Sequence, residues 1–229
     1  VPAARFIESR GGRILTLAKI AGLIERDGRV VGAVAESGEV FSARATVSTL
    51  PPWDLARLAL PRALARDFSE FKPSPIIGIN LWLDRPILRE ELFVGLIGTD
   101  IQWVFNKSLI LSGENRNGGS GQYLSLVISG ARKHLRQSPD DLVALAERDL
   151  SACFPEFQKT KILRRRVIKE PFATLSPIPG TEALRPKPGL ALPGFYLAGD
   201  WTKTGLPATI ESAAAAGHKA ALEIIKGEK

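Results

Sequence analysis

FYLAGDWTKTGLPATIESAAAAGHKAALEIIKG, residues 195–227, is the segment from which the fold of this chain can be worked out. An uncharged apolar run ends at Gly199 and Asp200, a polar loop follows, and a helix rich in alanine comes next. Such an apolar run is typical of a strand in the middle of a sheet. In open α/β sheets ligands bind beyond the carboxyl ends of the strands, which is where Asp200 lies. We therefore expect a ligand site at the start of this loop.

The chemistry of this loop favours a polar ligand with an extended shape. The Asp200 carboxylate can accept hydrogen bonds from sugar or polyol hydroxyls, and Gly199 lets a ligand approach the backbone. The first turn of the following helix has unpaired N–H groups and a partial positive charge, which favours an anion or an electron-rich oxygen by roughly 0.3–2 kcal/mol. The alanines have two readings: close packing against a sheet or cofactor, or simply high helix propensity.

The N-terminal part of the chain predicts a short helix and a β-meander. The run PAARFIESRGG predicts a helix that ends at Gly11 and Gly12. Three β-rich runs follow, separated by Asp27-Gly28 and by Ser37-Gly38, and Asp-Gly is a strong hairpin signal. We expect the last leg, EVFSARATVSTL, to be one strand that is buried within a sheet, because its end is apolar on both faces.

The middle of the chain predicts helices and half-buried strands. WDLARLALPRALARDFSEF predicts a helix interrupted at Pro61, and SPDDLVALAERDLSACFP predicts a helix with Ser138 as its N-cap. PIIGINLWLDRPI, IQWVFNKSLILS and GQYLSLVISGA alternate like strands, and GENRNGGSG predicts a hairpin loop. The basic run KTKILRRRVIKE, residues 159–170, is either a strand with one solvated face or a patch for lipid headgroups. The order of elements predicts an α/β fold with an α+β insertion.

The C-terminal segment resembles the flavin motif of the amine oxidase, phytoene desaturase and protoporphyrinogen oxidase superfamily. Its variant, LAGDWT-TGLPATIE-A, is most similar to the carotenoid desaturases and to the squalene-associated FAD-dependent desaturases, which are hydroxysqualene dehydroxylases. PSPIIGINLWLDRPI, QWVFNK, SLVISGAR and KEPFATLSPIPG favour the second branch. The resemblance covers nearly the whole chain.

This resemblance implies a fold and a domain division. We expect the C-terminal part of an FAD/NAD(P)-binding Rossmann-like domain of the glutathione-reductase type, joined to a substrate domain with a mixed or antiparallel sheet. Residues 1–54 and 173–229 would form the two parts of the FAD-binding domain, and residues 55–172 the substrate-binding domain.

The resemblance also implies a set of cofactor-binding residues. Asp200, with Gly199 beside it, would bind ribityl or phosphate-side hydroxyls of FAD. Thr209 and Ile210 would present backbone N–H groups to the flavin pyrimidine oxygen. The other implied contacts are Leu206 and Pro207 along the flavin, Lys19 and Ile20 at the adenine end, and Thr49 and Leu50 beside the dinucleotide.

Residues for the reaction itself are less clearly indicated. Glu170 and Thr174 lie where the resemblance brings a strand towards the substrate face of the flavin, and they are weak catalytic candidates beside a structural ion-pair and strand role. Trp201 either stacks near the flavin or packs in the core. Because a flavin carries the redox chemistry, a catalytic acid or base need not exist.

The glycine motif of dinucleotide-binding proteins is not found in these 229 residues. Gly-x-Gly-x-x-Gly normally places the pyrophosphate on a helix N-terminus, whereas GRVVG at 28–32 has the wrong spacing and lies in the predicted hairpin. The chain also contains no methionine. We expect a C-terminal fragment that is inactive alone and binds FAD weakly or not at all. Its sheet should have an apolar edge through which it can self-associate.

Composition and charge exclude several classes of function. The formal charge is +7, but the basic residues are not interleaved with aromatics, so a nucleic-acid platform is not expected. His134 and His218 lack acids or cysteine at metal-binding spacing, so no metal site is expected. Cys153 is the only cysteine, which excludes an internal disulfide and fits a reducing compartment. We expect a cytoplasmic protein, peripheral to the inner face of the membrane if the basic residues contact lipid.

The sequence thus predicts an FAD-dependent oxidoreductase of a polyisoprenoid, similar to hydroxysqualene dehydroxylase in squalene and hopanoid synthesis. A phytoene-type carotenoid desaturase and a flavin amine oxidase are the alternative enzymes. A cofactor-free interaction module is the alternative outside enzymes.

Overall fold

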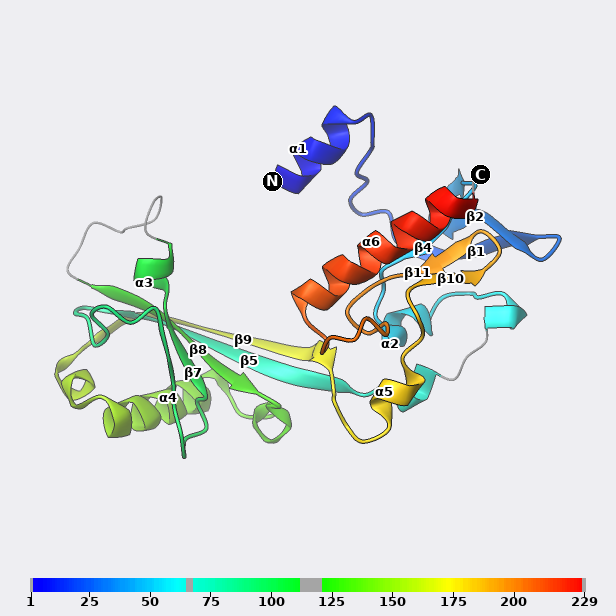
Figure 1. Cartoon of the computed structure of the whole chain (residues 1–229). Coiled ribbons are helices and arrows are strands. Elements are labelled where there is room, and N and C mark those ends of the chain that lie inside the picture. The colour runs from blue at the N-terminus through cyan, green and yellow to red at the C-terminus, as the bar shows by residue number, and fades with distance from the viewer. Residues whose placement is uncertain (1, 65–67, 112–120, 228–229) are drawn as a thin grey trace. The chain divides into compact units, whose positions relative to one another are not determined.

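The chain divides into two compact units, which are described separately here. The computed structural model describes residues 2–64, 68–111 and 121–227. Unit 1 comprises Val1–Phe71 and Pro177–Lys229, and unit 2 comprises Lys72–Ser176 (Figure 1). The first boundary lies later than the 54/55 boundary expected from the sequence, because the segment after residue 54 pairs with strands of unit 1. The second boundary lies near the expected 172/173.

Unit 1 contains two three-stranded sheets, with strand orders β1-β2-β3 and β10-β11-β4. Its strands are β1 (Ile20–Arg26), β2 (Arg29–Ala35), β3 (Val40–Ser42), β4 (Thr46–Ser48), β10 (Gly189–Leu192) and β11 (Phe195–Leu197). Its helices are α1 (Pro2–Ser9), α2 (Pro52–Leu55), α5 (Thr181–Leu184) and α6 (Ile210–Gly227), and its 3-10 helices are η1 (Arg62–Leu64) and η2 (Phe68–Glu70).

The predicted meander is confirmed for its first three strands. Asp27 and Gly28 have φ values of 51° and 72°, which are the positive angles that a two-residue hairpin turn requires. β1 pairs antiparallel with β2, and β2 pairs antiparallel with β3. The predicted central strand is also confirmed, since β11 lies between β10 and β4 and all three of its residues are buried.

The prediction of one long last leg is wrong, because this leg forms two strands in two different sheets. The Ala43 amide still bonds to Val31 in the meander, at 2.9 Å, whereas the Thr46 amide bonds to Gly194 at 2.8 Å. The chain therefore leaves the first sheet between these residues and pairs parallel with β11. β4 lies at the end of its sheet and Val47 is 41% exposed, so this strand is not buried as expected.

The prediction of a helix after Pro52 is also wrong beyond the first turn. α2 ends at Leu55, and Ala59 then forms two backbone hydrogen bonds with β1. Its carbonyl accepts one from the Leu23 amide at 3.1 Å, and its amide donates one to the Ala21 carbonyl at 3.0 Å. A Cβ at Gly22 would lie 2.8 Å from the Ala59 Cβ, so glycine allows this close approach. Pairing with β1 thus outweighs helix propensity in this segment.

The alanines of α6 serve both purposes that the sequence left open. Ser212, Ala216 and Ala220 form the buried stripe of the helix, and the two alanines pack with Tyr196 and Ala198. Small side chains at these positions let the helix lie close to the sheet. The remaining alanines are exposed or half-buried, where helix propensity is the reason for them.

Unit 2 is an antiparallel sheet with the strand order β6-β7-β8-β5-β9, covered on one face by α4. Its strands are β5 (Pro73–Leu83), β6 (Phe93–Gly95), β7 (Trp103–Asn106), β8 (Gln122–Ser129) and β9 (Ile162–Leu175). Its helices are α3 (Lys107–Ile110) and α4 (Pro139–Cys153), and its 3-10 helices are η3 (Arg132–His134) and η4 (Pro155–Lys159). Alternate residues of β5 and β8 are fully buried against leucines of α4.

Most of the local predictions for unit 2 are confirmed. α4 begins with a capping box between Ser138 and Asp141, and β5 and β8 follow the predicted strands. IQWVFNKSLILS was expected to be one strand, but β7 ends at Asn106, whose side chain caps the short helix α3. The glycine-rich hairpin loop falls largely on residues 112–120, outside the described residues.

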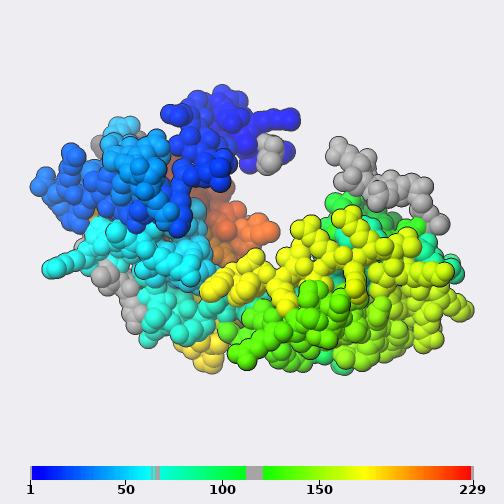
Figure 2. All heavy atoms as spheres, turned by 180° about the vertical axis from the view of Figure 1, so that it is seen from behind, coloured from blue at the N-terminus to red at the C-terminus, as the bar shows by residue number. Residues whose placement is uncertain are grey.

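The basic run forms a strand, as one of its two readings predicts. β9 is the last strand of the sheet, and its residues run along the surface of unit 2 in yellow in Figure 2. The pairing with β5 shifts between Trp82 and Leu83, which leaves Leu163 as an extra residue that is 67% exposed. A bulge and three consecutive arginines at an edge strand hinder pairing with other chains.

Among the helices of the described residues, none is long and apolar enough to cross a membrane.

Candidate functional site

The carboxyl ends of two parallel strands meet in unit 1. Because β4 and β11 pair in parallel, with Ser48 opposite Leu197, the residues that follow them lie side by side. These residues are Thr49 and Leu50 after β4, and Gly199 and Asp200 after β11. The pairing continues past the strands, since the Ala198 amide donates to the Ser48 carbonyl at 2.9 Å. The structure thus brings together four of the ten predicted cofactor residues.

A cavity of about 640 Å³ lies along β4 and the two residues that follow it, whereas Gly199 and Asp200 are not among its lining residues. Lys19, Ile20, Thr49 and Leu50 all line it, so four predicted residues from two separate segments share one cavity. Its apolar wall includes Leu23, Ala33 and Phe195. Its polar rim includes the Lys19–Glu36 ion pair, at 2.5 Å, and the Arg57–Asp54 ion pair, at 3.1 Å. An apolar wall with a few polar groups at the rim is typical of sites for small ligands and cofactors.

The second group of predicted residues lies at the start of α6. Thr209 caps this helix, since its Oγ1 accepts a hydrogen bond from the Ser212 amide at 3.2 Å and its carbonyl accepts one from Ala213 at 3.0 Å. The cap uses the Ser212 amide, whereas the amides of Ile210 and Glu211 precede the first bond within the helix and can donate to a ligand. Leu206, Pro207 and Ile210 are all exposed, and Ile210 is 90% exposed.

Asp200 connects the two groups of predicted residues. Its carbonyl accepts a hydrogen bond from Ser212 Oγ at 3.3 Å, and the same hydroxyl contacts Thr204 Oγ1 at 2.6 Å. Within residues 2–64, 68–111 and 121–227, no hydrogen bond or ion pair reaches the Asp200 carboxylate. This carboxylate follows a buried strand and is half-buried, with its oxygens free to accept hydrogen bonds from a ligand.

Gly199 has a structural reason in addition to the predicted one, which stays a prediction. Its φ is 120°, an angle that residues with a side chain rarely adopt. A Cβ at this position would lie 3.1 Å from Cδ1 of Trp201. The glycine therefore makes room for Trp201, in addition to any ligand that approaches it.

Trp201 packs in the core, which decides between its two readings. It is 1% exposed and meets Phe68 and Phe71 edge-on, with ring centroids 6.1 Å and 5.5 Å away. Its Nε1 donates a hydrogen bond to the Leu50 carbonyl at 2.9 Å. Trp201 thus fixes the ends of β4 and β11 relative to each other.

Arg185 is a residue of this site that sequence reasoning missed. It follows α5 and is 7% exposed, and its guanidinium bonds to the backbone of the loop after β11. In the sequence it is one arginine in a proline-rich connector, and no local signal separates it from the other basic residues there.

Both catalytic candidates lie on β9 in unit 2. Glu170 is exposed and pairs with Ile76 of β5, and Thr174 is half-buried and pairs with Ser74. Register places Glu170 on the sheet face opposite α4. We call this the open face.

The open face of unit 2 combines aromatic and basic side chains. Trp82 of β5 and Tyr123 of β8 stack with ring centroids 4.4 Å apart, and the Arg164 guanidinium of β9 lies 4.8 Å from the Trp82 ring. The Tyr123 hydroxyl donates to Asn80 Oδ1 at 2.8 Å. By strand register this face also carries Phe93, Trp103, Phe105, Val127, Arg166 and Ile168. Phe93 is 55% exposed and Ile168 is 46% exposed, and exposed apolar surface of this kind marks an interaction site.

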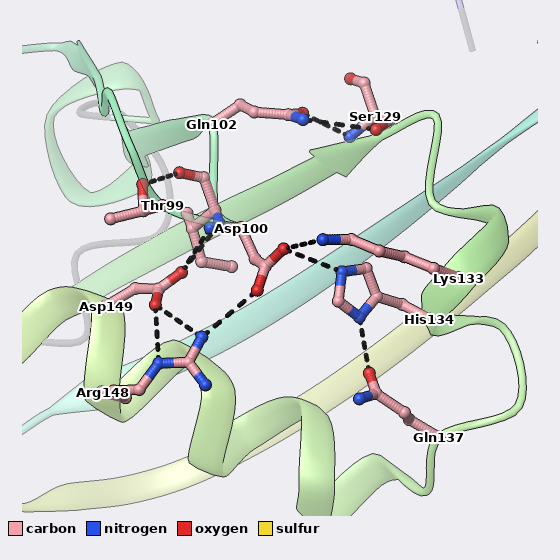
Figure 3. Close-up of polar contacts among 10 residues, drawn as sticks. Thr99, Asp100, Gln102, Ser129, Lys133, His134, Gln137, Arg148 and Asp149 are labelled. Atoms are coloured by element: carbon pink, nitrogen blue, oxygen red, sulfur yellow. Dashed lines mark hydrogen bonds and ion pairs between the residues drawn. The ribbon is translucent and has the colours of Figure 1, made fainter.

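A polar cluster in unit 2 centres on Asp100 (Figure 3). One carboxylate oxygen contacts Lys133 and His134 Nε2, and the other contacts Arg148 at 3.3 Å. The hydrogen bond from Lys133 is the main cause that lowers the Asp100 pKa below its ordinary value, assisted by His134 and opposed by burial. Asp149 accepts from the amides of residues 100 and 101, so the cluster joins the loop before β7 to α4.

This cluster has a structural role. His134 is 4% exposed, and its other ring nitrogen contacts Gln137 at 2.7 Å. In the described part of the chain, no group of three or more His, Cys, Asp or Glu side chains could hold a metal ion.

Comparison with known proteins gives one family. The profile of the flavin-containing amine oxidoreductases matches residues 2–225. The 15-cis-phytoene desaturase of Solanum lycopersicum is 26% identical over 237 residues, which cover 99% of this chain and 40% of that protein. The hydroxysqualene dehydroxylase of Sinorhizobium fredii is 26% identical over 228 residues, which cover 96% of this chain and 48% of that protein.

Two solved structures show the same fold. An oxidoreductase from Methanosarcina mazei has a TM-score of 0.71 at 18% identity, over 94% of this chain and 51% of that one. A redesigned putrescine oxidase has a TM-score of 0.75 at 14% identity, over 97% of this chain and 51% of that one. The chain thus spans about half of these structures and 40–48% of the two curated relatives.

Proposed function

Because the chain belongs to the family of flavin-containing amine oxidoreductases, we propose that it is part of an FAD-dependent oxidoreductase that acts on a polyisoprenoid. A hydroxysqualene-like alcohol is the first candidate substrate and a phytoene-like carotenoid the second. The two named relatives are equally identical to this chain, so overall identity does not separate these substrates. The activity proposed is that of the complete protein.

The observation that carries this proposal is the meeting of the β4 and β11 carboxyl ends, together with a cavity of about 640 Å³ that β4 and the residues after it line. We infer that unit 1 is the C-terminal part of a dinucleotide-binding domain of the glutathione-reductase type. In such sheets a ligand binds at the carboxyl ends of the strands.

The residues of unit 1 fit an FAD molecule. The Asp200 carboxylate is free to accept hydrogen bonds from ribityl hydroxyls, and Thr49 and Leu50 follow the neighbouring parallel strand. The cavity that Lys19 and Ile20 line would take the adenine end. The amides at the start of α6 would donate hydrogen bonds to the electron-rich edge of the flavin ring, and Leu206 and Pro207 would pack along it. When bound, the flavin would supply the two-electron redox chemistry.

The open face of unit 2 supports an apolar substrate rather than an amine. Its Trp82–Tyr123 stack and its exposed phenylalanine and isoleucine side chains offer apolar contacts to an isoprenoid chain. Arg164 and Arg166 lie on the same face beside this stack, where their positive charges oppose the binding of an ammonium group, whereas the Glu170 carboxylate lies further along β9, opposite Ile76. This favours the polyisoprenoid enzymes over a flavin amine oxidase.

We retain Glu170 and Thr174 as weak catalytic candidates, since their partners Ile76 and Ser74 are two positions apart on β5 and register places both on the open face. A Glu170→Gln variant of the complete protein should lower kcat and leave the flavin content unchanged. An unchanged kcat would remove Glu170 from the reaction.

We also propose that the protein is cytoplasmic and contacts the membrane surface through β9. This edge strand exposes three consecutive arginines beside Leu163, and such a pattern can bind anionic lipid headgroups. The complete protein should cosediment with vesicles that contain phosphatidylglycerol, and much less with vesicles of phosphatidylcholine alone. Equal binding to both would contradict a headgroup interaction.

The central test uses the complete protein with hydroxysqualene and phytoene in separate assays. The expected result is conversion of one of them, with flavin absorbance in the purified protein. Asp200→Asn should lower the flavin content, whereas Asp140→Asn, at an exposed position of α4, should not. Purified wild-type protein without flavin, and without activity after FAD is added, would overturn the proposal.

A further inference from the structure

Arg185 carries a charged side chain that is buried against the loop after β11. Its side chain is 5% exposed, and an arginine is almost never that buried unless every donor is satisfied. The residue lies directly after α5, and within the described part of the chain the acidic Glu182 of that helix is its only charged partner.

All five N–H donors of this guanidinium are used. Nε donates to Trp201 O, one terminal nitrogen donates to Glu182 Oε2 and Leu206 O, and the other donates to the carbonyls of residues 200 and 202. The five distances lie between 2.5 and 3.2 Å. Four of the five acceptors are therefore backbone carbonyls within the seven positions from Asp200 to Leu206.

This arrangement fixes the loop that leads from the strand end to the start of α6. Other groups also hold the loop. Trp201 bonds to the Leu50 carbonyl, Ser212 bonds to the Asp200 carbonyl and to Thr204, and the Lys203 amide donates to the Pro186 carbonyl at 2.7 Å. Arg185 is the only one of these groups that contacts both ends of the loop, residue 200 and residue 206. A flexible loop here would have to be ordered when a ligand binds, at a cost in binding free energy.

We propose that Arg185 is a positioning residue that holds the loop of residues 200–206 in its binding conformation before the cofactor arrives. It acts through the loop backbone, which places the Asp200 carboxylate and the Leu206 side chain, and it does not itself touch the cofactor. The inference that the ligand is a flavin rests on the proposed function. The inference that Arg185 orders the loop rests on the contacts alone.

The planar fork of arginine is needed for this role. Lysine keeps the charge but has three donors on a single nitrogen, so it cannot reach carbonyls on several sides of the loop at once. Arg185→Lys is therefore the informative substitution. Arg29→Lys is the matched control, because Arg29 also donates to a backbone carbonyl, that of Arg44 at 2.8 Å, but is an exposed residue at the start of β2 in unit 1.

The first measurement is amide hydrogen exchange on the flavin-free complete protein. In the wild type, the bonded amides of Thr202, Lys203 and Leu206 should already be protected. In Arg185→Lys, their exchange should accelerate while the amides of β1 and β2 keep their protection. The Arg29→Lys control should match the wild type. Loop amides that exchange freely in the flavin-free wild type, or that are unaffected by Arg185→Lys, would overturn the proposal.

The second measurement is the FAD dissociation constant of the same proteins. We expect it to rise about tenfold or more in Arg185→Lys, because hydrogen bonds to a charged group are among the stronger ones in proteins. If this variant does not fold, Glu182→Ala replaces it, since it removes one exposed acceptor and leaves four. It should shift loop exchange and FAD affinity in the same direction by less, and no shift in either would overturn the proposal.

These two measurements separate the two hypotheses. Suppose that the wild-type protein binds no FAD, but its loop amides are protected and lose this protection in Arg185→Lys. This result would contradict the flavin function and support the loop-ordering role. Equal FAD affinity in the wild type and in Arg185→Lys would contradict the positioning role of Arg185 and support the proposed flavin function.

Discussion

The indole Nε1 of Trp201 donates a hydrogen bond of 2.9 Å to the backbone carbonyl of Leu50, although 151 positions separate the two residues in the chain. This bond joins the residues that follow β11 to those that follow β4. The two strands themselves have only three residues each, so pairing between them is limited. The candidate site therefore depends on a core tryptophan as well as on the sheet.

Trp201→Phe tests this dependence. The substitution leaves the Leu50 carbonyl without its partner and leaves space beside Phe68 and Phe71, so unfolding free energy should fall by roughly 1–3 kcal/mol. Urea unfolding followed by circular dichroism measures the change. Trp103→Phe is the control, because Trp103 is 43% exposed and lies in unit 2. A loss in the control as large as at Trp201 would contradict the assigned role.

Substitution by alanine should change the stability of the protein in opposite directions at Gly199 and at Gly217. Gly199→Ala should destabilise the protein by about 1–3 kcal/mol, because φ is 120° and the new Cβ would meet Trp201. Gly217→Ala should stabilise it by about 0.5–1 kcal/mol, because Gly217 lies in α6 with open space around it. Thermal unfolding of both variants gives the comparison. A stabilised Gly199→Ala variant would show that the backbone at this position is not strained.

A structural feature could be predicted from the sequence when the residues that determine it lie close together in the chain. The hairpin at Asp27 and Gly28 and the start of α4 at Ser138 were predicted because their determinants lie within a few residues. The two errors at β4 and at Ala59 share a cause, since both segments pair with strands that are distant in sequence. No periodicity in the segment itself indicates such a partner.

The candidate site follows the same rule. Asp200 at the end of β11 was predicted from the apolar run and the loop, and Thr49 was expected beside the dinucleotide because of a family resemblance. That the two follow neighbouring parallel strands was not predicted and comes from the pairing of β4 with β11. Arg185 and Asp100 were not predicted, because all their partners except Glu182 lie 15 to 49 positions away and each looks like an ordinary surface charge in the sequence.

The Asp100 cluster should give unit 2 an acid-sensitive stability. The folded-state pKa of Asp100 lies below its ordinary value of 3.8, so its contribution is fully present above that value and is lost as pH falls through the lowered pKa. Asp100→Asn should therefore be less stable than the wild type at neutral pH, and the difference should shrink below pH ~4. Urea midpoints across this range measure it.

Asp140→Asn is the matched control for this pH dependence. Asp140 is 78% exposed in its side chain and pairs with the exposed Arg165, so its contribution should be small at every pH. If Asp100→Asn and the wild type differ by the same amount at neutral and acid pH, the ionised carboxylate is not what stabilises the loop before β7.

The edge of β4 should make this chain self-associate. Among the described strands β4 pairs with β11 alone, and Val47 is 41% exposed on it. Unpaired backbone groups beside an apolar side chain can pair with a second chain. Sedimentation of the 229-residue chain should show concentration-dependent association that Val47→Lys weakens. Val40→Lys, on the edge strand β3, should leave it unchanged, and a monomer at all concentrations would refute the prediction.

The 229-residue chain alone should bind FAD weakly. Its cavity and the Asp200 loop offer contacts to the two ends of the cofactor, but the sequence has no Gly-x-Gly-x-x-Gly loop to place the pyrophosphate on a helix N-terminus. FAD should therefore be lost on gel filtration and bind only at high concentration in a titration. Asp200→Ala should weaken even this residual binding, whereas Asp140→Ala should not. Yellow protein with one FAD per chain after gel filtration would mean that the contacts in unit 1 suffice without that motif.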